Sequence, residues 1–112
     1  MGDKDKVQIS DLTLPEKEEI TFGELTQATM GNATPVEVVA ANSERRALLL
    51  CNTSDTTGYF SFGDGTGLTT AVYSFSLATG IPLALYDEKI CKQAIMAICG
   101  QASKSVTYQE GA

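Results

Sequence analysis

Residues 46–52 read Arg-Ala-Leu-Leu-Leu-Cys-Asn, a short apolar run that ends in the turn-forming sequence Asn52-Thr53-Ser54-Asp55. Similar short runs, rich in β-branched, aromatic or apolar residues, recur along the chain at 34–40, 58–63, 70–75, 81–86, 95–99 and 105–109. Residues typical of turns separate them, so that they follow one another at intervals of roughly 8–12 residues. This spacing predicts an all-β fold, an antiparallel sandwich or barrel, and only residues 86–94 favour a helical turn or two.

The length and composition are those of one globular domain. The 112 residues are 43% hydrophobic and 20% charged, which is typical of a folded chain and not of a disordered one. The composition of the sequence changes near residue 30, because residues 1–24 hold seven acidic residues and three lysines, a net charge of −4. We therefore predict an extended N-terminal arm over residues 1–30 and a β-sandwich domain over residues 31–112.

Several classes of function are excluded by what the chain lacks. It has no histidine, so Ser-His-Asp catalysis, Cys-His catalysis and histidine metal sites are all excluded. The net charge of −6 makes nucleic acid and anionic membranes poor partners. The start, MGDKDKVQIS, lacks the apolar core of a secretory signal, and no apolar run approaches the length of a membrane span. Three cysteines, Cys51, Cys91 and Cys99, indicate a reducing compartment and buried thiols, not a disulfide framework.

Two local patterns invite a chemical interpretation and are explained better as structure. The loop Gly63-Asp64-Gly65-Thr66-Gly67 lacks the lysine and the helix of a phosphate-binding loop, so it predicts a turn in which glycines supply positive φ. The adjacent carboxylates Glu18-Glu19 and Asp87-Glu88 predict charged loops, because neighbours on a strand point to opposite faces and cannot act on one bond. We therefore expect no enzyme activity, no cofactor and no metal site.

The arm carries spaced apolar side chains among its charges. Short alternation of this kind favours extended pieces that add to a sheet edge or enter a groove of a partner. The alternative is a frayed and solvated terminus. On the first interpretation, the partner-binding residues of the arm are Val7, Ile9, Leu12, Leu14, Ile20 and Phe22.

Arg45 and Arg46 form the one pair of adjacent basic residues, directly before the strongest apolar run. One interpretation is a structural pair at the start of a strand, solvated or bonded to local acids. The other is a contact with an acidic partner surface, in which the guanidinium groups bind carboxylates at two points. On the second interpretation, both arginines join the candidate partner-binding residues.

Several segments resemble small virion proteins of tailed phages. The resemblance is carried by an N-x-x-R-x-x-L-x-x-x-N strand over residues 42–52, and by Y-x-S-F-G, G-I-P-L, A-I-x-A-I and V-T-x-x-E-G at residues 59–63, 80–83, 94–98 and 106–111. With its length and acidic arm, the chain is similar to the capsid decoration (staple or cement) proteins of short-tailed phages of the epsilon-fifteen type. The similarity covers residues 35–112 and departs from the family's pattern at the cysteines and at residues 86–93.

The resemblance implies a jelly-roll-like antiparallel β-sandwich on the outside of an icosahedral capsid. There it would clamp neighbouring subunits of the major capsid protein, as a homodimer on the capsid surface. The protein would then belong to the virion, after synthesis in the host cytoplasm. Two alternatives stay open: a tail or connector component of the virion, and a carbohydrate-binding host-recognition module on the same kind of scaffold.

Overall fold

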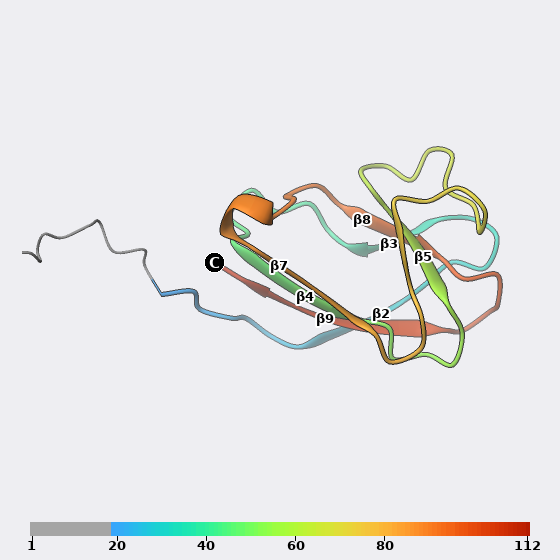
Figure 1. The fold of residues 1–112 in the computed structure, drawn as a ribbon, viewed down its shortest axis with the longest axis horizontal. Helices are drawn as coiled ribbons and strands as arrows, with labels where there is room; N and C mark the ends of the chain where they lie inside the picture. Colours follow the sequence, from blue (N-terminus) through green and yellow to red (C-terminus); the bar gives the residue numbers. More distant parts are fainter. Residues whose placement is uncertain (1–18) are drawn as a thin grey trace, which may run out of the picture.

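The structure, a computed structural model, describes residues 19–112 and places eight named strands in two antiparallel sheets (Figure 1). The elements are β2 (Thr26–Thr29), β3 (Val36–Val39), β4 (Ala47–Cys51), β5 (Gly58–Phe62), β6 (Phe75–Leu77), β7 (Pro82–Tyr86), the 3₁₀ turn η1 (Asp87–Lys89), β8 (Ile95–Ile98) and β9 (Ser105–Gly111). The predicted all-β sandwich is confirmed, and the helical turn expected within residues 86–94 is η1.

The two sheets have matching sizes and interleaved chain order. Sheet I has the order β2-β9-β4-β7, and sheet II has the order β3-β8-β5-β6. The chain passes from one sheet to the other after every strand from β2 onward except β5, which forms a hairpin with β6. This connectivity is compatible with the jelly roll that the sequence led us to expect.

The core lies between the sheets because inward-facing positions on both are apolar. Leu48 and Leu50 of β4 are fully buried, and Leu50 lies between Tyr108 of β9 and Leu83 of β7 in the register of sheet I. From sheet II, Phe60 enters the core and stacks on Phe75, with ring centroids 4.9 Å apart. Alternation along the strands therefore directs one set of side chains inward, as a sandwich requires.

Two predicted boundaries need correction. Residues 26–29, assigned to the arm, form β2 and pair with β9, and Met30 is buried in the core. The sandwich therefore begins several residues before residue 31. The strand expected over residues 70–75 is wrong: β6 starts only at Phe75, and the residues before it form a loop.

The loop of residues 63–74 lies on the outer side of sheet II. Its glycines Gly63, Gly65 and Gly67 adopt positive φ, which confirms the predicted turn. A Cβ atom at Gly65 would lie only 3.1 Å from the side chain of Met96, so the loop packs directly on β8. Leu68, in the middle of the loop, is buried. The chain thus covers part of the outer face of sheet II with its own residues.

Candidate interaction surface

The outer face of sheet I is built from three rows of side chains that cross its strands. The strand register places Leu49 of β4 beside Gln109 of β9 and Ala84 of β7, and places Cys51 beside Thr107 and Pro82. These positions alternate with the buried Leu48 and Leu50, so their side chains point away from the core. We call this outer surface the apolar face, made up of Ile20, Phe22, Leu25, Gln27, Leu49, Cys51, Pro82, Ala84, Tyr86, Thr107 and Gln109. Ala47 and Gly111 lie in the same rows but are buried, next to the side chains of Ile20 and Phe22.

No residue of the apolar face carries a charge, although 20% of the residues in the whole chain are charged. Leu25 is 67% exposed, and Phe22 and Tyr86 are also exposed. A shallow hollow of about 140 Å³ lies on this face, with Leu25, Leu49, Cys51 and Pro82 among its lining residues. An uncharged surface with exposed large side chains is typical of a binding interface.

Two of the predicted arm residues lie on the apolar face. The segment around Phe22 runs beside the end of β9, because Thr21 and Ala112 exchange both backbone hydrogen bonds, each at 3.0 Å. A Cβ atom at Gly111 would lie 2.5 Å from a methyl group of Ile20, so the missing side chain makes room for this segment. Ile20 and Phe22 therefore extend the sheet of their own domain. The other predicted residues, Val7, Ile9, Leu12 and Leu14, lie outside the described residues.

Arg45 is not a surface residue, which corrects its assignment to a partner contact. Its side chain is fully buried, and Nε donates to Oε2 of Glu110 at 2.6 Å. The remaining guanidinium nitrogens donate to the carbonyl oxygens of Ala40 at 2.6 Å, Cys91 at 2.6 Å and Gln93 at 3.1 Å. Arg45 thus joins the loop after β3, the segment before β8 and the end of β9, as the structural interpretation required.

Arg46 lies at the surface and faces a carboxylate of its own chain. Its Nη2 atom is 3.2 Å from Oδ1 of Asp87, and each side chain is 28% exposed. The Asp87 amide also donates to the Arg46 carbonyl at 2.8 Å, which continues the pairing of β4 with β7. The structural interpretation describes Arg46 as well, although its partial exposure leaves it accessible to a partner.

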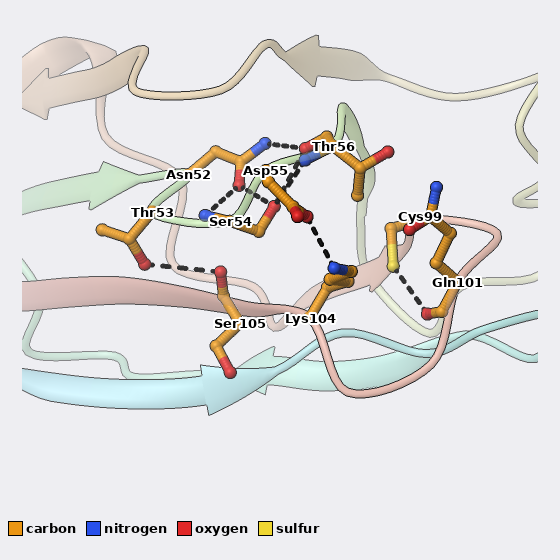
Figure 2. A network of polar contacts seen from close by, with 9 residues as sticks. All are labelled: Asn52, Thr53, Ser54, Asp55, Thr56, Cys99, Gln101, Lys104 and Ser105. Carbon is orange, nitrogen blue, oxygen red and sulfur yellow. Dashed lines mark hydrogen bonds and ion pairs between the residues drawn. The ribbon is translucent and has the colours of Figure 1, made fainter.

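A network of polar contacts lies at one end of the sandwich (Figure 2). The buried Asn52 donates from Nδ2 to the carbonyls of Thr56 at 2.7 Å and Leu77 at 2.8 Å, and its Oδ1 accepts from the Ser54 amide and hydroxyl. These bonds replace backbone pairing where the chain leaves β4. Asn52 therefore fixes the loop of residues 53–57 against the sandwich.

The same end of the molecule carries an exposed ion pair. Lys104 Nζ lies 2.6 Å from Oδ1 of Asp55. The hydrogen bond and the charge of Lys104 lower the pKa of Asp55. A polar hollow of about 340 Å³ adjoins this pair, with Gln27, Thr53 and Ser103 among its lining residues. Its walls are hydroxyl, amide and charged groups, in contrast to the apolar face.

A further hollow, of about 220 Å³, lies under the loop that covers sheet II. Ser61, Thr66, Tyr73 and Ser74 are among the residues that line it. The Oγ atom of Ser61 is buried and has no hydrogen-bond partner within the part of the chain that the structure describes. Tyr73 is 44% exposed, and its ring centroid is 5.0 Å from that of Tyr59. The hollow therefore combines an exposed aromatic ring with hydroxyl groups.

The three cysteines are free thiols, of which Cys99 is buried while Cys51 and Cys91 are half-buried. Between residues 19 and 112 no group of three or more cysteine, aspartate or glutamate side chains is arranged to hold a metal ion. No helix in the same range is long and apolar enough to cross a membrane. Comparison with protein-family models, curated proteins and solved structures found no match to this chain.

Proposed function

We propose that this protein is a structural virion component that decorates the outer surface of a capsid and staples neighbouring major capsid protein subunits together. The observation that carries the proposal is the difference between the outer faces of the two sheets. The chain's own loop packs on sheet II, whereas sheet I presents the uncharged apolar face with Leu25 and Tyr86 exposed. The sequence resemblance to capsid decoration proteins supports the same role, which requires no catalysis and no cofactor.

Adhesion follows from burial of the apolar face. A large apolar side chain contributes roughly 1.5–3 kcal/mol when it passes from water into a fully buried site. The side chains of Leu25, Phe22 and Tyr86 are exposed, so their burial against a partner can contribute to the binding free energy. Many copies on one lattice multiply this modest energy, because each bound copy links subunits that other copies also hold.

The arm supplies the second contact in this proposal. Residues 1–18 precede the segment that runs beside β9, so the spaced apolar residues Val7, Ile9, Leu12 and Leu14 can reach a neighbouring subunit. An extended arm adds to an exposed sheet edge through backbone hydrogen bonds, and its side chains fill pockets beside that edge. The partner is the major capsid protein, and the site of action is the surface of the virion.

Copy number in purified virions tests the role. Quantitative mass spectrometry of particles should give hundreds of copies of this chain, comparable in number to the major capsid protein. Six or twelve copies would instead place it in the tail or connector, the alternative role within a virion. Absence from purified particles would overturn the proposal.

A carbohydrate-binding role is favoured by one feature, the hollow under the sheet II loop. Tyr73 offers an exposed aromatic ring on which a sugar ring can stack, and Thr66 and Ser74 supply hydroxyl groups to the lining of the same hollow. A glycan array probed with the full chain tests this role. Binding that Tyr73→Ala abolishes would favour it over capsid decoration, and an array without binding would reject it.

A further inference from the structure

The segment before β2 meets β9 in a different register from β2 itself. Thr26, the first residue of β2, lies opposite Tyr108. Phe22, four positions earlier, lies opposite Gly111, which is only three positions further along β9. The stretch between Phe22 and Thr26 is therefore one residue longer than the stretch of β9 that it faces, and the extra residue forms a β-bulge.

The bulge decides on which side of sheet I the apolar side chains of this segment lie. Side chains alternate along a strand, so Phe22 and Leu25, three positions apart, would point to opposite faces of a regular strand. Gly111 lies in the outer rows, and a Cβ atom there would lie 2.5 Å from Ile20 Cγ2 and 3.3 Å from Phe22 Cδ1. Leu25 lines the hollow on the same outer face. The extra residue thus brings both sets of side chains to the apolar face.

The two backbone polar groups of Gly23 hold the bulge against β9. The Gly23 amide donates to the carbonyl of Glu110 at 2.8 Å. The Gly23 carbonyl accepts from Nε2 of the Gln109 side chain, also at 2.8 Å. In a regular antiparallel pair, the second bond would come from the Glu110 amide. The Gln109 side chain therefore supplies this bond in place of the backbone.

We infer that Gln109 is a positioning residue for the apolar face. Its side-chain amide holds the bulge, and the bulge sets Ile20 and Phe22 beside Leu25 on the surface that meets the major capsid protein. This inference rests on the proposed function, because the capsid is the partner that the face is proposed to bind. The position of the bulge, in contrast, is measured on the protein alone.

A glutamine suits this place because it donates a hydrogen bond without bringing a charge. Gln109 lies in one row with Leu49 and Ala84, in the middle of the uncharged surface. A lysine there would put an ammonium group on the apolar face, which opposes burial against a partner. A leucine would keep the face uncharged but would leave the Gly23 carbonyl without this donor.

Gln109→Leu tests the inference in solution. By hydrogen exchange, the Gly23 amide should exchange at least about fivefold faster than in the natural chain, since one of the bonds that hold the bulge is lost. The nuclear Overhauser effect between the Phe22 ring and the Gly111 α protons should weaken. Gln27→Leu makes the same replacement at an exposed position of the apolar face and should leave both signals unchanged.

Deletion of Glu24 provides a rescue of the same defect. It removes the extra residue, so Gly23 can exchange both backbone bonds with Glu110 while Phe22 stays opposite Gly111. Gln109→Leu should then leave the exchange of the Gly23 amide unchanged in the shortened chain. Faster exchange in both chains, or in neither, would show that Gln109 does not hold the bulge and would overturn the inference.

Co-sedimentation with capsids separates positioning from direct contact. Gln109→Leu adds apolar surface to the face, so a residue that acted only by contact would allow equal or tighter binding. Positioning predicts binding at least about fivefold weaker, restored when Glu24 is also deleted. Faster exchange with unchanged capsid binding would overturn the positioning role. A natural chain that does not bind capsids refutes the proposed function, while the exchange measurements still decide whether Gln109 holds the bulge.

Discussion

Arg45 and Glu110 meet inside the sandwich, with Nε of the guanidinium 2.6 Å from Oε2 of the carboxylate. Arg45 is fully buried while the Glu110 side chain is 26% exposed, so the pair connects the core to the surface at the end of β9. Because Arg45 also donates to three backbone carbonyls, it supplies hydrogen bonds to two further chain segments, the loop after β3 at Ala40 and the segment before β8 at Cys91 and Gln93.

Replacing Arg45 should therefore destabilise the protein strongly. Arg45→Ala leaves the carbonyls of Ala40, Cys91 and Gln93 without this donor, and a loss of about 3–5 kcal/mol in the free energy of unfolding is expected for breaking such a buried pair. Arg46→Ala is the matched control, because its ion pair with Asp87 is partly solvated and contributes at most about 1 kcal/mol. Urea denaturation of both variants measures the difference, and equal losses would contradict the assignment.

Asn52→Asp should make stability depend on pH in a defined direction. The new carboxyl group would be buried and would face the carbonyls of Thr56 and Leu77, so its pKa in the folded state is raised above the ordinary aspartate value of about 3.9. A raised pKa means that stability is retained at low pH and lost as the pH rises through it. Unfolding in urea from pH 4 to pH 8 should show a growing deficit relative to Asn52→Ala. A deficit that does not vary with pH would contradict this account.

Two exposed carboxyl groups with lowered pKa values should respond differently to one substitution. Lys104 lowers the pKa of Asp55, whereas hydrogen bonds from Thr66 lower that of Asp64, whose Oδ1 accepts from the Thr66 amide at 2.9 Å. Both pKa values lie below the ordinary 3.8, so both contributions to stability are present above that pH and are lost in more acidic solution. In a carboxyl NMR titration, Lys104→Met should raise the pKa of Asp55 and leave that of Asp64 unchanged. A shift of both would refute the assignment.

The arm should contribute to binding and not to folding. Replacement of Val7, Ile9, Leu12 and Leu14 together by serine removes the apolar groups that offset the entropy of ordering an extended segment, about 1–2 kcal/mol per residue for the backbone. We expect capsid binding to weaken by at least about tenfold, while the urea midpoint of the full-length chain stays unchanged. Unchanged capsid binding would show that the terminus is merely solvated.

The strands that could be predicted from the sequence are those whose side chains carry a clear pattern. β4 is marked by the run Ala47–Cys51 and by the asparagine that follows it. β2 was missed because TQAT has a single inward apolar residue, Ala28, and its place in the sheet depends on pairing with β9. The strand before β7 was predicted too early in the chain, because residues 70–75 include strand-forming residues. In the structure β6 begins at Phe75, and the residues before it lie in the loop outside sheet II.

Two of the strands that form the interaction surface have a sequence pattern that indicates an apolar outer face. Residues 47–51 and 82–86 are apolar at nearly every position instead of at every second one, which indicates strands with two apolar faces. The sequence indicates the burial of Arg45 less clearly. Adjacent side chains on an extended chain point to opposite sides, so only one arginine of the pair can face outward. Which of them does so depends on the distant carbonyls of Cys91 and Gln93, and no local pattern reveals that.

The most direct test of adhesion through the apolar face compares two exposed aliphatic residues on opposite sides of the sandwich. Leu25 on the apolar face is 67% exposed, and Val72 in the sheet II loop is 64% exposed, so aspartate at either position should leave the fold intact. Co-sedimentation with capsids assembled from the major capsid protein measures the dissociation constant of each variant. Leu25→Asp should weaken binding by at least about tenfold while Val72→Asp binds like the natural chain. Equal binding by both variants, or weakening by Val72→Asp alone, would contradict the account.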